Sequence, residues 1–587
     1  MKWITTLKNV FKGMGESIYR FPLTVGYLLA VAILNALMIE NTEMDFTRLI
    51  YTFLVGAMLS VVGQMLHERF VEKSTARYSF MVAALILTLG YYFAVGPQYE
   101  FDIAITVKTF VAIFALVIAF IWVPSINKEE VPFHQSFLSA VKAFFTAFLF
   151  TFVLASGVGA IYSATNYLLF DVDPNVLAHI LNLVVALFAP IYFLSMTPVY
   201  PNEKEKMAHQ FSVPPFLEVL ISYIVVPLLS IYTLILVIYV VINFTGEFWT
   251  DNLLEPLLVS YAVIGILILI LSYNLENRLA VLYRQIFPKV LVPIVVFQTI
   301  ASMLKIREMG ITHGRYYVIL FGVFATITGL IYSFMKPKHH GYIAGVLLVL
   351  VTISIVPPVD AFTISKNNQI ALLEETLLEN EMLREEEIVP NSNVSTEDRI
   401  VITKTAEYIN NLGYQEEVTF LPEDFNVYND FTRVFGFNQT YSPVEDPQMS
   451  GQYMYLDRED LVFETEDTEI LIFQMLSVSE DQENDPLDSL SFVVSDETYE
   501  LERELGDRYY TFTVRDEDGT ALIDLPLEEV FDEIFEDVVE FQETTLSVDE
   551  ATYTVENDAA KLELLVLSLE RTDEYNTIEG ALFIQIK

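Results

Sequence analysis

Long apolar runs fill the first 360 residues of the chain, and they constrain its fold more than any other feature. A membrane-spanning helix needs about 20 mostly apolar residues, and the chain offers eleven candidate runs of this kind. The runs cover residues 21–39, 49–66, 78–95, 104–123, 137–161, 174–196, 215–243, 254–272, 288–304, 316–334 and 341–356. This pattern predicts a polytopic α-helical membrane bundle of about eleven spans, surrounded by the lipid bilayer.

The charged residues are distributed unequally along the chain. Residues 1–360 contain 21 Lys and Arg and 21 Asp and Glu, whereas residues 361–587 contain 12 and 56. The formal charge of −44 therefore belongs to the second part, while the mean hydropathy of the whole chain is +0.43. An acidic soluble domain that follows a neutral membrane bundle accounts for both values.

These two patterns predict four segments. In residues 1–20, apolar side chains alternate with Lys2, Lys8 and Lys12, which favours an interfacial amphipathic helix on anionic headgroups. A plain cytoplasmic overhang is the alternative. The other three segments are a transmembrane helical domain at 21–358, an amphipathic connecting helix at 359–394 and an acidic soluble α+β domain at 395–587.

The cations of the short loops predict the orientation of the bundle. Cytoplasmic loops of membrane proteins carry an excess of Lys and Arg. With the N-terminus inside, the inner segments hold 14 Lys and Arg. The outer loops 40–46, 96–103, 163–173 and 244–252 hold none, and the outer loop 305–315 holds three. We therefore expect a multipass protein of the cell membrane with a cytoplasmic N-terminus. Its odd number of spans would put the C-terminal domain on the extracytoplasmic side.

All three outer cations lie in one loop, residues 305–315. Gly310 suits the C-terminal cap of one helix, and Thr312 suits the N-terminal cap of the next. Because a helix N-terminus favours anions, this loop is a candidate anion site. Its candidate anion-binding residues are Lys305, Arg307, His313 and Arg315.

The expected ligand of this loop is an anionic lipid headgroup, a small anionic ligand with a phosphate or carboxylate, or the acidic domain of the chain itself. Two alternatives stay open. The cations can simply anchor the helices by reaching toward the headgroups, or one span is miscounted and the loop is cytoplasmic.

The same loop carries a resemblance. It contains the pattern R-x-x-G-[IL]-T-x-x-R-Y and resembles a segment of an uncharacterised bacterial multipass membrane family, one of the numbered domain-of-unknown-function groups. Members often have an aromatic residue before the glycine, where this chain has Met309. Two further segments are similar to that family: Arg20-Phe21-Pro22, and residues 364–369 running into Leu372-Leu373 and 380–383. The resemblance implies the membrane architecture and no activity.

Polar side chains are rare within the predicted spans. They are Asn35, Gln64, Lys108, Lys142, Glu218 and Gln298. Ionisable residues at membrane depth often mark functional sites, so Lys108, Lys142 and Glu218 are candidate intramembrane polar residues. Each lies close to the end of its run, and anchoring at the membrane surface is the alternative.

Prolines interrupt three of the later runs, at Pro190, Pro227 and Pro293. Transporters often use broken helices to expose backbone groups to a substrate. The alternative is that Pro and Gly are common in membrane helices in general. The small residues around Gly157 favour a helix-packing face.

The acidic part of the chain predicts helices and strands in alternation. Residues 369–388 form an amphipathic helix, a capping pattern at Ser395 begins a second helix, and 527–538 form a third. Asp518-Gly519 predicts a tight hairpin. The expected strands are 452–456, 461–464, 469–475, 489–494, 509–515, 520–524, 561–569 and 581–586.

Several classes of chemistry are disfavoured. The chain has no cysteine, which removes disulfides, thiolate nucleophiles and cysteine-bound metals. Its charge disfavours nucleic acid as a partner, and no nucleotide-binding G-x-x-x-x-G-K-[ST] loop is present. Residues 481–488 alternate oxygen side chains but lack the glycine and glutamate of a calcium loop. We therefore predict no catalytic residues, no metal and no cofactor.

Three functions remain open. The first is a transport or permease-like membrane protein with an extracytoplasmic domain that captures or senses a ligand. The second is a non-catalytic envelope sensor or assembly partner. The third is a membrane-embedded transferase that acts on a phosphate-bearing lipid. The sequence favours transport slightly over sensing, makes an enzyme the weakest reading, and gives no oligomeric state.

Overall fold

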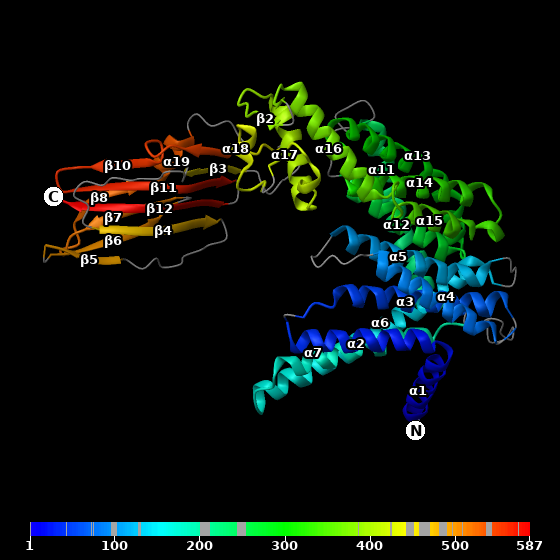
Figure 1. Ribbon diagram of the computed structural model, residues 1–587. Helices are drawn as coiled ribbons and strands as arrows, with labels where there is room; N and C mark the ends of the chain where they lie inside the picture. The colour runs from blue at the N-terminus through cyan, green and yellow to red at the C-terminus, as the bar shows by residue number, and fades with distance from the viewer. Residues whose placement is uncertain are drawn as a thin grey trace. The chain divides into compact units, whose positions relative to one another are not determined.

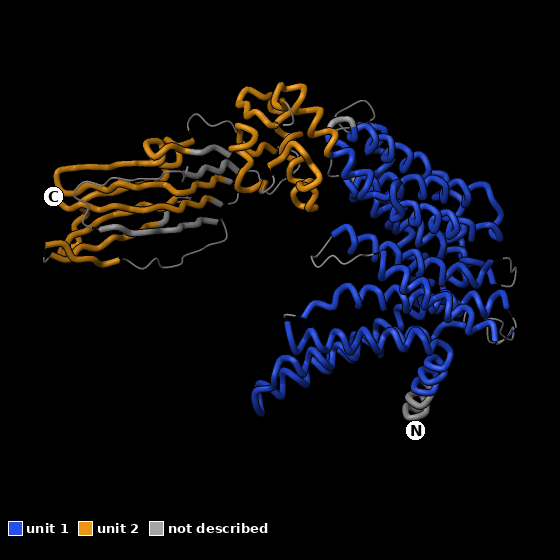
Figure 2. Tube along the Cα trace, in the orientation of Figure 1, with its two compact units in different colours: residues 1–369 blue, residues 370–587 orange. Residues whose placement is uncertain are grey.

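The structure is a computed structural model, and the chain forms two compact units in it, residues 1–369 and 370–587 (Figure 2). The residues that it describes are 2–42, 44–71, 73, 75–94, 103–126, 131–199, 212–243, 254–384, 387–422, 425–441, 451–456, 470–479, 490–495, 497–506, 509–535, 543–572 and 575–587. We describe each unit by itself.

The described residues of the first unit form helices and their connections (Figure 1). Its first half contains α1 (Lys2–Arg20), α2 (Pro22–Glu40), α3 (Thr47–Phe70), α4 (Ala76–Ala94), α5 (Ile103–Trp122), η1 (Val123–Ser125), α6 (Phe133–Leu168), α7 (Pro174–Leu183), η2 (Val184–Phe188) and α8 (Ala189–Ser195). Its second half contains α10 (Pro215–Val219), η3 (Leu220–Val225), α11 (Val226–Asn243), α12 (Leu254–Ser272), α13 (Arg278–Met309), α14 (His313–Phe334), η5 (Pro337–His339), α15 (Tyr342–Ile353) and α16 (Ala361–Glu379), which continues into the second unit.

Nine helices among the described residues are long and apolar enough to cross a membrane. Helices α12 and α15 lie at the other two predicted runs. Helix α15 has only 12 residues, which rise about 18 Å, whereas the hydrocarbon core is about 30 Å thick. The membrane-embedded multipass bundle is thus confirmed, while the number of eleven spans stays a prediction.

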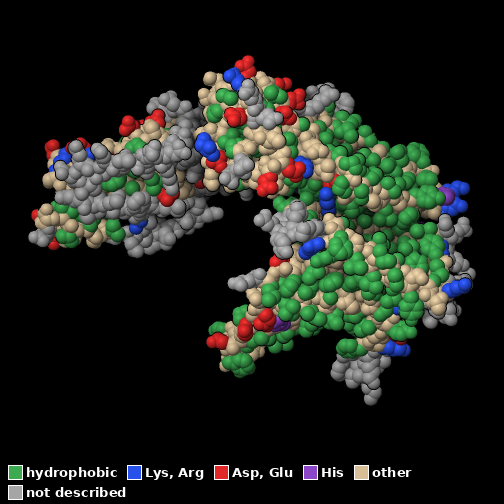
Figure 3. All heavy atoms as spheres, viewed as in Figure 1, with side chains coloured by type: hydrophobic (Ala, Val, Ile, Leu, Met, Phe, Trp, Pro, Cys, Tyr) green, Lys and Arg blue, Asp and Glu red, His purple; other side chains and the backbone are tan. Residues whose placement is uncertain are grey.

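The outer surface of this unit is apolar, as a bilayer requires. Hydrophobic side chains cover most of the face of the unit that Figure 3 shows. In the apolar window of α6, only 6% of the residues are buried within the protein, and Phe145, Leu149 and Phe152 are exposed large hydrophobic side chains of this helix. Such a surface is stable only where lipid, not water, covers it.

Polar contacts join the helix ends in two separate groups. At one end, Arg20 pairs with Glu68 at the end of α3; we call this the Arg20 end. At the other, Lys108 near the start of α5 pairs with Asp360 just before α16; we call this the Asp360 end. Which end faces the cytoplasm stays a prediction.

Local sequence signals explain several helix boundaries. The Asp173 side chain accepts a hydrogen bond from the backbone N–H of Asn175, and Asn277 does the same for Ala280, which caps α7 and α13. Helix α13 ends at Gly310 with a positive φ of 65°, and Thr312 caps α14. The two predicted caps of the 305–315 loop are confirmed.

The chain stays helical through all three prolines, so the predicted interruptions are wrong. Directly before Pro190 and Pro227 the helix takes the π register at η2 and η3. Helix α13 continues through Pro293 without a π segment. Membrane helices tolerate a proline where neighbouring groups compensate for the missing N–H. Around Gly157 nothing lies within 4 Å of an added Cβ, so no described part of the chain packs there.

The helix predicted at 369–388, within the connecting segment 359–394, also has different bounds. Helix α16 begins at Ala361 and ends at Glu379. It starts earlier because the Asp360 carboxylate accepts hydrogen bonds from the backbone N–H groups of Phe362 and Thr363, as an N-terminal cap does. The polar stretch before residue 369 is therefore part of the helix.

The second unit begins with a small helical region. It contains β1 (Leu383–Arg384), β2 (Glu387–Ile388), α17 (Thr396–Asn411), η6 (Gln415–Glu417) and α18 (Phe431–Phe435). Leu377, Met382, Ile402 and Phe435 are fully buried in its own core. The predicted helix after Ser395 is confirmed, with the Ser395 side chain as its cap.

Two sheets follow. Their strands are β3 (Gly451–Leu456), β4 (Ile470–Ser479), β5 (Leu490–Val494), β6 (Glu497–Leu505), β7 (Tyr510–Arg515), β8 (Ala521–Pro526), β9 (Glu543–Leu546), β10 (Thr552–Glu556), β11 (Ala560–Thr572) and β12 (Tyr575–Ile586). The six-stranded sheet has the order β4-β12-β11-β3-β9, with β10 paired to β11, and the four-stranded sheet has the order β5-β6-β7-β8. Only β3 and β9 pair in parallel among the described strands. Both sheets and α19 (Leu527–Phe535) share one apolar core.

The hairpin at Asp518-Gly519 is confirmed, since β7 and β8 pair across it. The third predicted helix is confirmed over α19. Strand β6 was not predicted, because its glutamates hide the alternation that buries Tyr499 and Leu501. The predicted strand 461–464 and the 481–488 oxygen-rich loop lie outside the described residues.

Candidate functional site

A large cavity lies among helices α2, α3, α5, α6 and the continuous helix Pro174–Ser195, which combines α7, η2 and α8 and is called the α7–α8 helix below. Its volume is about 1010 Å³, which is the size of a binding pocket for a small molecule. Aliphatic and aromatic side chains form most of its wall, and Asn35, Asn182 and Thr151 are its polar members.

Two smaller spaces lie between this cavity and the Arg20 end. A second cavity of about 380 Å³ shares Leu28 and Phe144 with the first. A third space of about 10 Å³ shares Phe120 with the second and is lined by Ser139 and Thr197. The three spaces therefore follow one another through the bundle, wide near Asn35 and almost closed near Thr197.

An amide pair forms the polar part of the wide cavity. Asn35 Nδ2 donates a hydrogen bond to Asn182 Oδ1 at 3.0 Å, and Asn182 Nδ2 donates to the backbone oxygen of Ala32 at 2.7 Å. Asn182 is only 7% exposed. The pair links α2 to the α7–α8 helix and brings amide groups to an otherwise apolar wall.

Thr151 behaves differently from the other threonines of α6. The hydroxyl groups of Thr146 and Thr165 donate to backbone oxygens four residues earlier, the usual arrangement in membrane helices. The Thr151 hydroxyl is buried and has no hydrogen-bond partner among the described residues. A buried hydroxyl without a partner is costly unless a ligand or water binds it.

The π-helical segment η2 contributes Val185 and Ala186 to the wall, and Ala189 and Pro190 follow directly. Pro190 has no N–H, so it cannot complete the regular α-helical hydrogen bonding of the preceding turn. The helix accommodates this by the wider π register, which is frequent at functional sites.

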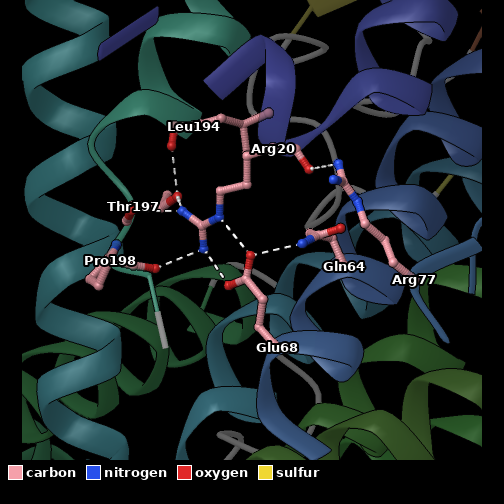
Figure 4. Close-up of polar contacts among 7 residues, drawn as sticks. All are labelled: Arg20, Gln64, Glu68, Arg77, Leu194, Thr197 and Pro198. Atoms are coloured by element: carbon pink, nitrogen blue, oxygen red, sulfur yellow. Dashed lines mark hydrogen bonds and ion pairs between the residues drawn. The ribbon is translucent and has the colours of Figure 1, made fainter. Parts of the chain in front are cut away.

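A salt bridge lies next to the narrow space (Figure 4). The Arg20 guanidinium donates from Nε to Glu68 Oε1 at 2.8 Å and from Nη2 to Glu68 Oε2 at 2.7 Å. The two side chains are 12% and 10% exposed. Such a two-bond pair between planar groups is among the strong ion pairs of proteins.

The same guanidinium binds the segment after α8. Arg20 Nη1 donates to the backbone oxygen of Thr197 at 3.0 Å, and Nη2 donates to that of Pro198 at 2.8 Å. Gln64 Nε2 supports Glu68 at 2.9 Å. Thr197 and Pro198 line the narrow space, so Arg20 holds the wall of the cavity at the point where the cavity is closed.

The predicted anion-site residues lie at the Asp360 end. Arg315 Nη1 donates to the backbone oxygens of Met309 and Gly310 at 3.2 and 3.0 Å, so it caps α13. The His313 ring stacks on Phe362 at 4.9 Å. Lys305 is 8% exposed.

The Arg307 side chain lies outside the described residues. The structure thus shows where three of the four predicted side chains lie, and anion binding by this loop stays a prediction.

Two of the segments that resemble the family meet in this region. Asn368 Oδ1 accepts from the backbone N–H of Ile311 at 2.5 Å, and Gln369 Nε2 donates to the backbone oxygen of Met309 at 3.1 Å. The Tyr316 hydroxyl donates to the backbone oxygen of Val359 at 2.7 Å. The first turns of α16 therefore cover the 305–315 loop.

Lys108, a predicted intramembrane residue, forms an ion pair of 2.7 Å with the fully buried Asp360. Burial alone would raise the pKa of Asp360, but hydrogen bonds from Lys108 and Thr363 outweigh it and hold the pKa below its ordinary value. Lys108 thus fixes the start of α16 to the bundle.

The other two predicted intramembrane residues also have partners. Lys142 Nζ donates to the backbone oxygen of Ser212 at 2.8 Å. Glu218 Oε1 accepts from Asn277 Nδ2 at 3.1 Å. Neither Lys142 nor Glu218 lines the cavities described above.

Some residues of this site stood out in the sequence, but the cavity that they form was not predicted. Asn35 and Gln64 are among the rare polar residues of the spans, and Arg20 belongs to a segment that resembles the family. Glu68 and Thr151 were missed, because an acid at a helix end and a threonine in an apolar helix are common. Among the described residues, no three His, Cys, Asp or Glu side chains lie together as metal ligands would.

Comparison with known proteins gives one family. The family described as "Domain of unknown function (DUF4153)" matches residues 25–390, which is more than half of the chain. The match includes most of the cavity wall and the 305–315 loop with the start of α16. No curated protein and no solved structure matches this sequence.

Proposed function

This chain belongs to the DUF4153 family, whose domain has no known function, and we propose from its geometry that it is a permease-like membrane protein. It takes a mainly apolar molecule into the cavity between α2, α6 and the α7–α8 helix and passes it along the bundle. The observation that carries this proposal is the cavity of about 1010 Å³, with two smaller spaces that share lining residues in succession toward the Arg20 end.

The closed end supports transport over simple binding. A carrier must close its path on one side while it is open on the other. The Arg20–Glu68 pair holds Thr197 and Pro198 at the narrowest space, and it can open by the exchange of a few hydrogen bonds. The π-helical segment η2 lies on the same helix and provides a place where that helix can change its register.

We take the Arg20 end as the cytoplasmic end of the path. The support for this orientation is the excess of Lys and Arg in the loops that the sequence assigns to that side. The acidic second unit then lies outside the cytoplasm and acts as a capture or sensing domain. Its charge keeps an exposed domain soluble and attracts cations to the membrane surface.

The experiment uses the absence of cysteine from the chain. Ser139 is 6% exposed and lines the narrow space, so Ser139→Cys reports its opening. The full chain carrying this change is placed in lipid nanodiscs and treated with a charged, water-soluble thiol reagent. Glu16→Cys, at a side chain that is 70% exposed, is the control that reacts at once.

The proposal predicts slow but complete reaction of the Ser139→Cys thiol. Adding Glu68→Gln, which removes the charge that holds Arg20, should raise the rate roughly tenfold or more, because the lost interaction is worth over ~1.4 kcal/mol. A thiol that stays unreacted in both backgrounds while the control is consumed would mean a sealed bundle, and the sensor role would then replace transport.

A further inference from the structure

The described wall of the wide cavity is uncharged and has a few hydrogen-bonding groups. The described residues that line it include no Lys, Arg, His, Asp or Glu. Moving a charged group into such surroundings costs far more than moving a neutral polar group. The cavity therefore disfavours ions, phosphates and carboxylates, and it favours a molecule that is uncharged at the depth of Asn35.

The polar groups of the wall come from three helices, α2, α6 and the α7–α8 helix. Asn35 and Asn182 are already bonded to each other, while the Thr151 hydroxyl has no partner among the described residues. All three line the same cavity. A turn of the Thr151 side chain about its Cα–Cβ bond would bring the buried hydroxyl to the cavity, where a ligand hydroxyl or ester would complete its hydrogen bonding and share the amide pair.

The apolar wall is long enough for a hydrocarbon chain. Along α2, the wide cavity reaches Ile39 and the second cavity reaches Thr24. This stretch of helix rises about 22 Å. One leaflet of a bilayer provides about 15 Å of hydrocarbon, half of the full core, so a lipid chain fits beside α2 with its polar end near Asn35.

We propose that the ligand of this cavity is an uncharged amphiphile, that is, a lipid-like molecule with hydrocarbon chains and a neutral hydroxyl or ester head. The head binds Thr151 and the Asn35–Asn182 pair, and the chains extend toward Leu194 at the narrow end of the second cavity. This inference rests on the proposed function, since it names the class of molecule that the same cavity takes.

The test is photo-crosslinking of the full chain in phosphatidylcholine nanodiscs. The probe is a diacylglycerol with a diazirine in one chain, and the labelled peptides are identified by mass spectrometry. Competition compares unlabelled diacylglycerol with phosphatidic acid of the same chains, because the two molecules differ only in the charged phosphate. We expect labelling of α6 and the α7–α8 helix and at least tenfold better competition by diacylglycerol.

Two pairs of variants locate the ligand. Thr151→Val removes the unpartnered hydroxyl while keeping the shape, and Thr165→Val is the matched control on the same helix, where the hydroxyl bonds only Ile161. The loss of one hydrogen bond should weaken diacylglycerol binding roughly 3- to 10-fold in Thr151→Val and leave Thr165→Val unchanged. Ala186→Trp, which fills the cavity, should abolish labelling, while Leu149→Trp on an exposed side of α6 should not.

The outcomes separate this inference from the proposed function. Equal or better competition by phosphatidic acid would overturn the uncharged class, although a cavity that takes lipids would stand. Equal labelling of Thr151→Val and the unchanged chain would overturn the role of Thr151. Labelling that avoids α6 and the α7–α8 helix, or that Ala186→Trp does not reduce, would overturn both the ligand and the permease-like function.

Discussion

A single guanidinium joins three parts of the chain at the narrow end of the cavity. Arg20 is the last residue of α1, binds Glu68 at the end of α3 and binds the backbone after α8. Burial of an ion pair is expensive, and the gain depends on good geometry and on extra hydrogen bonds for the remaining donors. Arg20 has both, since its donors reach Glu68, Thr197 and Pro198. Removing one partner leaves the other charge buried and unpaired.

Glu68→Gln should therefore lower the stability of the bundle. The expected loss is about 3 kcal/mol, because the Arg20 charge stays buried without its counter-ion. Thermal unfolding of the full chain in detergent measures it. Glu16→Gln is the control, since Glu16 pairs with Lys12 in an exposed position and its loss should change stability by under about 1 kcal/mol. Equal effects of the two changes would contradict a structural role for Arg20.

His340 predicts a pH dependence of stability. It is 1% exposed, and burial lowers its pKa from 6.5 to about 4. Because the folded protein disfavours the charged form, stability is full above pH 6.5 and falls as the pH drops toward 4. The free energy of unfolding falls by roughly 3 kcal/mol over this range, because each unit of pKa shift corresponds to ~1.4 kcal/mol.

Thermal unfolding between pH 7 and 4 tests this dependence. His340→Phe should reduce the loss of stability at low pH by roughly 3 kcal/mol, since the ring packs between Tyr273 and Tyr332 and a phenyl group can take that place. His339→Gln, at the preceding and less buried position, is the control that should keep the dependence. A pH profile that is the same in His340→Phe and the unchanged chain would contradict the assignment.

At the level of elements, the two π-helical segments are the least regular parts of the bundle. Segments η2 and η3 both precede a proline, yet Pro293 in α13 has no such segment. The proline alone therefore does not decide the register, and the packing around each helix does. Only η2 lines the cavity, which connects its irregular backbone to the proposed path.

Pro190→Ala tests this connection. Alanine restores the N–H, so the π turn can return to a regular α-helix, and the side chains at Val185 and Ala186 then rotate away from their present positions. We expect unchanged or slightly higher thermal stability. Labelling of the cavity by the diacylglycerol probe should fall at least fivefold, which corresponds to the loss of about one hydrogen bond to the ligand. Pro293→Ala, in a helix without a π turn, should leave labelling unchanged. Retained labelling in Pro190→Ala would rule out a role for η2.

The β7–β8 hairpin of the second unit gives a test that is independent of the membrane. Gly519 has a φ of 79°, and nothing lies within 4 Å of an added Cβ. Gly519→Ala should therefore lower the stability of the hairpin by about 1 kcal/mol, through backbone strain alone. Amide hydrogen exchange in the hairpin should become correspondingly faster, while the exposed change Glu517→Ala should not alter it. Unchanged exchange in Gly519→Ala would contradict the left-handed turn.

At the level of the whole molecule, the sequence predicted the elements better than their contacts. Apolar runs predicted the membrane helices, because spanning length is a one-dimensional property. Gly310 and Thr312 predicted a helix boundary for the same reason. The cavity depends on how five helices pack, and Asn182 or Thr151 looks ordinary until its neighbours are known. Helix α16 begins early because of Asp360, whose partner Lys108 is distant in the sequence.

In our proposal, the bundle holds a lipid-like molecule between α2, α6 and the α7–α8 helix. An electron cryo-microscopy map of the full chain in lipid nanodiscs tests this proposal most directly. We predict elongated density from the Asn35–Asn182 pair past Thr151 toward Leu194. The Arg20–Glu68 ion pair should be intact beyond the Leu194 end of this density. Helices packed tightly against one another, with the Thr151 hydroxyl bonded to the backbone of its own helix and no space between them, would contradict the account.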